Sequence, residues 1–186
     1  LRNKIFYFLL RWEAYNEVLD GLEQIDWESR VSLQDMRAKA FLGLRRFRDA
    51  CETMINRIRQ KPSIPASLLL ARCYLKRGDY QSAQEIAEDL LAMEEGPTPG
   101  AQGLLGEVYV GKREIDEAEK VFLAIQRRSP KSRSSLIGLM RVHSERSDLI
   151  TAIAYAVRAR AAEENETPVP ISQLQTLRDF FIETGE

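Results

Sequence analysis

The chain has 186 residues, 44% of them hydrophobic and 30% charged, a composition typical of a folded soluble protein. Its 27 basic and 28 acidic side chains give a formal net charge of −1, so charge offers no reason to expect nucleic acid or an anionic membrane as a partner. No apolar run approaches the ~18 residues that span a bilayer, and no signal peptide is visible. We therefore expect a cytoplasmic location. Because the sequence begins at Leu1 rather than Met, we also expect it to be a fragment of a larger protein.

Apolar residues at helical spacing, interrupted by polar, glycine or proline-containing turns, predict helices along the whole chain. In chain order the predicted helices are 1–11, 15–26, 31–44, 47–60, 64–77, 80–93, 99–112, 115–128, 133–146, 149–162 and 172–184.

The apolar pattern is also periodic over a longer distance. In its clearest unit an aromatic residue, Tyr109, follows Gly106 by 3 residues, and Ala118, Phe122 and Pro130 follow it by 12, 16 and 24. Small residues at such positions let two helix backbones approach closely, and the aromatic ring fills the space beside them. Proline ends the second helix, because it cannot continue one.

The same pattern fits four further segments and restarts at Leu177 and Phe181. The positions equivalent to Gly106 are Phe6, Ala38, Ala71 and Met140. In chain order, with Gly106 between Ala71 and Met140, the successive spacings are 32, 33, 35 and 34 residues. The aromatic or apolar position that follows holds Leu9, Phe41, Tyr74 and His143, and the alanine position of the second helix holds Val18, Ala50, Ala83 and Ala152.

These units resemble the tetratricopeptide repeat (TPR), whose period is 34 residues. The resemblance covers repeats at approximately 1–30, 31–62, 64–97, 99–131 and 133–165, followed by a terminal helix at 172–184. It implies an all-α fold, an alpha–alpha superhelix in which antiparallel helical hairpins form a right-handed solenoid, with one domain over 1–186. Four residues depart from the pattern: Phe6 and Met140 replace a small residue, Val18 replaces alanine, and Arg37 stands where Leu or Ile normally packs.

Residues for catalysis or metal binding are sparse. The single histidine, His143, falls on the aromatic position, so we interpret it as a packing residue rather than a catalytic group or ligand. Cys51 and Cys73 do not form a CxxC pair, and we interpret them as small buried hydrophobic residues. No phosphate-binding glycine motif occurs. We expect no enzyme activity, no catalytic residue, no metal and no cofactor.

The resemblance also implies a site, because the concave groove of such solenoids is lined by the first helix of each hairpin. The outward positions of these helices predict an apolar strip with interspersed charges that suits a partner segment with apolar anchors and some acidic character. The predicted groove residues are Tyr7, Leu10, Arg11, Lys39, Leu42, Arg72, Leu75, Lys76, Glu107, Val110 and Arg141.

The leading functional hypothesis is therefore a protein–protein interaction scaffold, as a module of a larger regulatory or assembly protein. Self-association, including a homodimer, is the alternative, and a nucleic-acid-binding helical solenoid is the third. Glu107 in the predicted groove counts against nucleic acid. A clamp for a carboxyl-terminal carboxylate is not reproduced, since Asn3 is the only asparagine in a predicted groove-facing helix.

Overall fold

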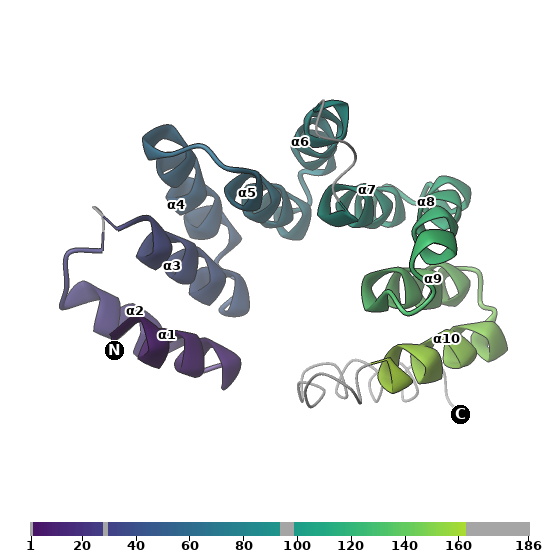
Figure 1. The fold of residues 1–186 in the computed structure, drawn as a ribbon, viewed down its shortest axis with the longest axis horizontal. Coiled ribbons are helices and arrows are strands. Elements are labelled where there is room, and N and C mark those ends of the chain that lie inside the picture. The colour runs from purple at the N-terminus through teal and green to yellow at the C-terminus, as the bar shows by residue number, and fades with distance from the viewer. Residues whose placement is uncertain (1, 28–29, 94–98, 163–186) are drawn as a thin grey trace. The chain divides into compact units, whose positions relative to one another are not determined.

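The computed structural model describes residues 2–27, 30–93 and 99–162. Within these residues it contains ten α-helices and no strand (Figure 1). Their bounds are α1 Arg2–Arg11, α2 Tyr15–Glu23, α3 Val31–Gly43, α4 Phe47–Gln60, α5 Ile64–Arg77, α6 Tyr80–Ala92, α7 Pro99–Gly111, α8 Ile115–Arg128, α9 Arg133–Glu145 and α10 Leu149–Ala161. The helices fall into two compact units, unit 1 (residues 1–114, α1 to α7) and unit 2 (residues 115–186, α8 to α10).

The all-α prediction is confirmed, and nine of the ten predicted helices in the described residues have ends within one residue of those predicted. The exception is α2, which ends at Glu23 rather than at residue 26. Its last turn tightens, since the amide of Ile25 donates to the carbonyl of Leu22 at 3.1 Å. The predicted helix at 172–184 lies outside the described residues. The single domain over 1–186 stays a prediction.

Helices pack in the order of the chain. In unit 1 each helix packs on the next, and the first helices of successive hairpins also contact one another, α1 with α3, α3 with α5 and α5 with α7. In unit 2, α9 packs on both α8 and α10. Unit 1 therefore has a layer of first helices in mutual contact, which is the layer that holds most of the predicted groove residues.

Every turn inside a hairpin has the same backbone conformation. One residue takes a positive φ of 57° to 85° at the same repeat position, and these residues are Glu13, Arg45, Gly78, Arg113 and Ser147. The residue after it donates its amide to a carbonyl five residues back, as from Asp79 to Tyr74 at 2.9 Å. This is the hydrogen-bond pattern of the Schellman motif, which satisfies carbonyls at a helix end. Only one of these five positions holds the glycine that the conformation favours.

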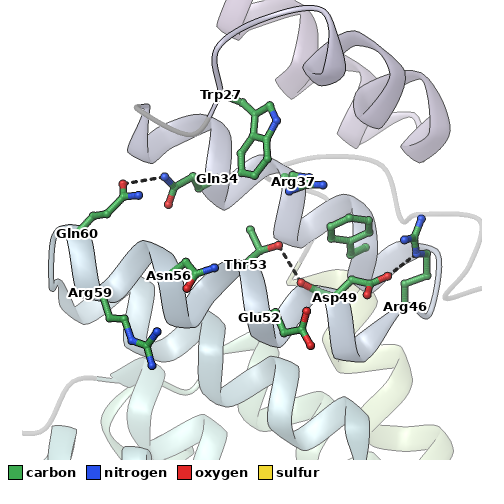
Figure 2. A pocket seen from close by; sticks show the side chains of 11 residues that line it. Trp27, Gln34, Arg37, Arg46, Asp49, Glu52, Thr53, Asn56, Arg59 and Gln60 are labelled. Atoms are coloured by element: carbon green, nitrogen blue, oxygen red, sulfur yellow. Dashed lines mark hydrogen bonds and ion pairs between the residues drawn. The ribbon is translucent and has the colours of Figure 1, made fainter.

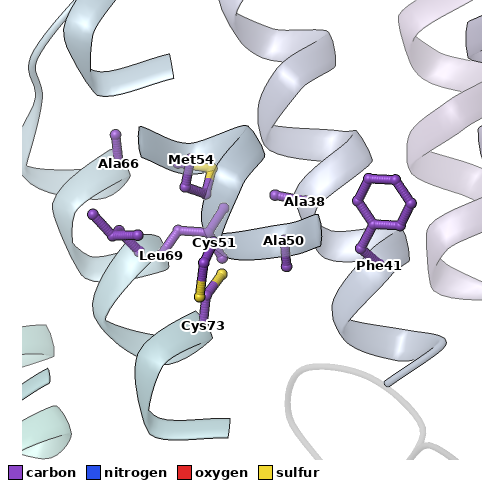
Figure 3. Packing of buried hydrophobic residues seen from close by; sticks show 9 residues of the cluster. Ala38, Phe41, Ala50, Cys51, Met54, Ala66, Leu69 and Cys73 are labelled. Atoms are coloured by element: carbon purple, nitrogen blue, oxygen red, sulfur yellow. The ribbon is translucent and has the colours of Figure 1, made fainter. Parts of the chain in front are cut away.

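The core of unit 1 follows the predicted repeat positions. One cluster joins α1, α2 and α3 through Phe6, Val18, Leu22, Leu33, Met36 and Ala40. A second joins α3, α4 and α5 through Ala38, Phe41, Ala50, Cys51, Met54, Ala66, Leu69, Leu70 and Cys73 (Figure 3). The replacements Phe6 and Val18 are thus accommodated, because the larger side chains face each other in one cluster.

Unit 2 is built on a close contact between α8 and α9. A Cβ added to Gly138 of α9 would lie 2.4 Å from the ring of Phe122, which is buried in α8. Gly138 therefore gives the ring the space it needs, and Leu136, Leu139 and Val142 of α9 are buried beside it.

Candidate functional site

The layer of first helices in unit 1 exposes the charged side chains of the predicted groove. Arg11, Lys39, Arg72 and Lys76 are all exposed, as is Tyr7 of α1. Because α1, α3 and α5 are linked by direct contacts, these side chains belong to one connected helical layer. Arg141 is also exposed, but it lies in unit 2.

The predicted apolar strip is less accessible than its charged neighbours. Leu10, Leu42 and Leu75 are half-buried and pack against the core clusters, and Glu107 is half-buried as well. Val110 is buried and leaves the candidate surface. The surface formed by α3 and α5 is therefore mainly cationic, and its apolar part is concentrated on α1.

The cations of this surface are not neutralised within the described residues. Lys39, Arg72 and Lys76 have no ion pair or hydrogen bond there, whereas arginines elsewhere do: Arg57 lies 3.1 Å from Asp35, and Arg77 lies 2.6 Å from Asp79. An anionic side chain of a partner would meet these three charges without first displacing an intramolecular carboxylate.

Two tyrosines outside the predicted set of groove residues pack on the ends of first helices. A Cβ added to Gly43 would lie 2.3 Å from the ring of Tyr15, and one added to Gly111 would lie 2.4 Å from the ring of Tyr80. Each ring, at the start of a second helix, thus lies directly on the end of the next first helix. Burial, followed by the charge of Glu13, raises the pKa of Tyr15, so this phenol stays neutral.

A separate cavity of about 520 Å³ lies over α3 and α4 (Figure 2). Arg37 is one of the residues that line the cavity. Its guanidinium lies 3.8 Å from the ring centroid of Trp27 and 5.0 Å from that of Phe41. Arg37 thus forms cation–π contacts where the equivalent residues of the other repeats are isoleucine or leucine. Arg46 and Asp49 at the rim pair at 2.6 Å, so part of the lining charge is already compensated.

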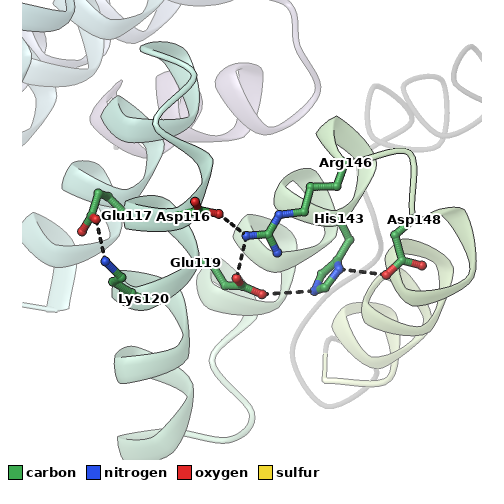
Figure 4. Close-up of polar contacts among 7 residues, drawn as sticks. All are labelled: Asp116, Glu117, Glu119, Lys120, His143, Arg146 and Asp148. Carbon is green, nitrogen blue, oxygen red and sulfur yellow. Dashed lines mark hydrogen bonds and ion pairs between the residues drawn. The ribbon is translucent and has the colours of Figure 1, made fainter.

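A polar cluster joins the three helices of unit 2 (Figure 4). Arg146 lies 2.6 Å from Asp116 and 2.8 Å from Glu119, both on α8. Nδ1 of His143 lies 3.1 Å from Oδ2 of Asp148, and its ring stacks on Tyr155 with centroids 5.4 Å apart. His143 therefore packs on Tyr155, as expected of the aromatic position, and it also contacts Asp148 at the start of α10.

Neither cysteine has the character of a nucleophile. Cys51 and Cys73 are buried and face each other across α4 and α5 (Figure 3). Burial, followed by the neighbouring Cys51, raises the pKa of Cys73 to about 12, and burial also raises the pKa of Cys51. Both thiols are therefore protonated near neutral pH, whereas the thiolate is the reactive form.

The described residues also contain no group of three His, Cys, Asp or Glu side chains placed to hold a metal ion. None of the described helices combines the length and the apolar character that crossing a membrane requires.

Comparisons with known proteins agree with this fold. Residues 68–133 match the tetratricopeptide repeat family model, whereas no curated protein matches the chain. Among solved structures, the chain is similar to a chain of the APC/C hetero-tetramer Cut9–Hcn1, with 19% identity and a TM-score of 0.63. This match covers 76% of the present chain but only 27% of the other, so the present chain spans about a quarter of that relative.

Two further structures match over most of their length. MamA (residues 41 to the end) from Desulfovibrio magneticus RS-1 is 18% identical with a TM-score of 0.60, and the match covers 89% of this chain and 94% of that one. A kinesin-light-chain-type protein with nearly identical TPR-like repeats from Podosopora anserina is 18% identical with a TM-score of 0.60, covering 88% and 93%. At these identities the similarity shows the fold, and it confirms the TPR-like arrangement of helical hairpins. Residues 68–133 therefore match the tetratricopeptide repeat family, and the described residues share the fold of TPR-like helical hairpins.

Proposed function

We propose that the chain is a protein-binding module and that the first-helix layer of unit 1 takes an acidic segment of a partner protein. The observation that carries this proposal is the set of exposed cations Lys39, Arg72 and Lys76 on α3 and α5, two helices in direct contact, which have no ion pair or hydrogen bond among the described residues. Tyr7 and the half-buried Leu10 on α1 offer apolar contacts beside them. A segment combining carboxylates with one or two apolar anchors fits this combination of groups.

The fold supports a binding role over a catalytic one. The two thiols are buried and protonated, and the single histidine is held by Asp148 and Tyr155. In the solved structure of Cut9–Hcn1, a protein of similar fold belongs to a hetero-tetramer, so this fold supports contacts between proteins there. In the present chain the first helices of unit 1 also form a layer in mutual contact. Within the described residues, Lys39, Arg72 and Lys76 on the outward surface of this layer form no ion pair.

The test uses two defined probes: a fluorescein-labelled peptide of alternating Leu and Glu, and its Leu and Lys counterpart. We expect the acidic peptide to bind the full chain in fluorescence anisotropy and the basic peptide not to bind. The variants Arg72→Glu and Lys76→Glu should each weaken acidic-peptide binding by roughly tenfold, as expected when an attractive charge becomes repulsive. Their melting temperatures should stay unchanged, because both side chains are exposed and unpaired.

Arg59→Glu is the matched control. Arg59 is an exposed cation of unit 1, but it lies on α4 at the cavity over α3 and α4. The same charge reversal at Arg59 should leave peptide binding unchanged. If Arg59→Glu abolishes binding while Arg72→Glu and Lys76→Glu do not, the site lies at the cavity and the proposal is wrong.

A further inference from the structure

Helix α1 has an apolar face that no other helix of the described residues covers. Ile5, Phe8 and Trp12 are 54%, 60% and 68% exposed, and their spacing of 3 and 4 residues places them on one side of the helix. The rings of Phe8 and Trp12 lie 5.7 Å apart between centroids. A cluster of this size on a soluble protein marks an interaction surface more often than a chance exposure.

The repeat register shows what kind of surface this is. Phe8 occupies the position of Ala40, Cys73, Val108 and Val142 in the later first helices, and each of those four side chains is 0% exposed. Ala40 packs in one cluster with Val18 of the preceding α2, and Cys73 with Cys51 of the preceding α4 (Figure 3). Phe8 thus stands where a first helix packs on the second helix before it.

Helix α10 has the complementary exposed face. Ile150, Ile153 and Val157 are 84%, 39% and 62% exposed, again at spacings of 3 and 4 residues. Ile153 occupies the position of Leu19, Cys51, Gln84 and Glu119 in the earlier second helices. This stripe therefore stands where a second helix packs on the first helix that follows it.

The internal junctions show which positions meet. Oε1 of Gln84 lies 2.8 Å from Nζ of Lys112, just after α7, and Oε2 of Glu119 lies 2.8 Å from Nη2 of Arg146, just after α9. Asp116, at the position of Ile150, also contacts Arg146 at 2.6 Å (Figure 4). The position of Lys112 and Arg146 is held in α1 by Trp12. These two junctions thus pair polar with cationic groups, whereas Cys51 at the α4–α5 junction and both end faces present apolar groups at the same positions.

We propose that these faces bind each other between two copies of the chain, with α10 of one copy packed on α1 of the next. Trp12 would contact Ile150 and Ile153, in place of the Arg146 contacts with Asp116 and Glu119. The second copy is the occupant because both halves of the contact are on this chain, are apolar and share the register of its internal junctions. The contact is head-to-tail, so it forms open chains or rings rather than a closed two-fold dimer. It does not depend on the proposed peptide site, which lies on other positions of the helices.

Sedimentation velocity on the full chain tests the contact. We expect the weight-average mass to rise above the 21.3 kDa of one chain as the concentration increases. Phe8→Glu removes the α1 face and Ile153→Glu removes the α10 face, so each variant alone should be monomeric. An equimolar mixture of the two variants should form a complex of two chains, because each retains the face that the other has lost. Tyr7→Glu places the same charge on an exposed position on another side of α1 and should associate like the original chain.

Three results would overturn the proposal. A monomer of the original chain at all concentrations would show that the faces do not bind each other. Association that is lost in Phe8→Glu but unchanged in Ile153→Glu would mean that α1 pairs with α1. Variants that stay monomeric when mixed would exclude a head-to-tail contact, and circular dichroism of each variant checks that it is folded.

Discussion

The left-handed turn residue of each hairpin makes a quantitative prediction. Gly78 has a φ of 85°, and a Cβ added there would have no atom within 4 Å, so Gly78→Ala tests the backbone conformation without a steric clash. The left-handed conformation costs an L-residue about 1 to 2 kcal/mol. The lower entropy of alanine in the unfolded chain returns about 0.4 to 1 kcal/mol. We therefore expect Gly78→Ala to lower the free energy of unfolding by about 1 kcal/mol.

The reverse exchange should work at the equivalent position of unit 2. Ser147 has a φ of 60° and is exposed, so Ser147→Gly should be more stable than Ser147→Ala by about 1 kcal/mol. At Ala154, an exposed site inside α10, the order should invert, because glycine in a helix is about 0.5 to 1 kcal/mol worse than alanine. Urea unfolding followed by circular dichroism measures each difference, and a change of about 1 kcal/mol should move the melting temperature by roughly 2 to 4 °C. If alanine is preferred over glycine at all three sites, the turn residues do not hold this conformation in solution and the reasoning fails.

Two further predictions concern groups with shifted pKa values. Burial raises the pKa of Cys73 to about 12 and also raises that of Cys51. An aromatic disulfide reagent at pH about 8 should therefore label both thiols slowly in the folded chain and fully in the urea-unfolded chain. Fast labelling of the folded chain would contradict the burial of the two thiols. Hydrogen bonds from Thr151, followed by His143, lower the pKa of Asp148. The contribution of Asp148 to the stability of the folded chain is therefore complete above the ordinary pKa of about 3.9, and it is lost as the pH falls through the lowered pKa. The difference in urea midpoint between the original chain and Asp148→Ala should therefore shrink below pH ~4, and an equal difference at acid and neutral pH would exclude this cap.

Most of the fold could be predicted because the packing of a hairpin depends on local sequence. Small residues such as Ala38 and Ala71 recur at fixed positions, and the structure buries both completely. The turn conformation could not be predicted in the same way. Arg113 and Ser147 adopt a positive φ although neither residue type favours it, because the closing hydrogen bonds of the helix end select that conformation.

The candidate surface could be predicted only in part. Periodicity identifies Lys39 and Arg72 as outward positions, and the structure exposes both. The burial of the next positions along the helices depends on the neighbouring helices. For this reason Leu75 packs against a core cluster and Val110 is buried. The contact of Tyr15 with Gly43 joins residues far apart in the chain, and helical periodicity carries no information about such a pair.

The chemistry of each junction also limits what can pack against what. Arg146 meets two carboxylates from α8, so an apolar second helix in their place would remove both ion pairs from its partly exposed guanidinium. Conversely, Trp12 facing Glu119 would desolvate a carboxylate without a compensating donor. The two polar junctions, α6 with α7 and α8 with α9, therefore discourage exchange with the apolar faces of α1 and α10, and those faces favour apolar partners. This difference in polarity is the physical reason to expect that association between copies uses the two end faces rather than the polar junctions.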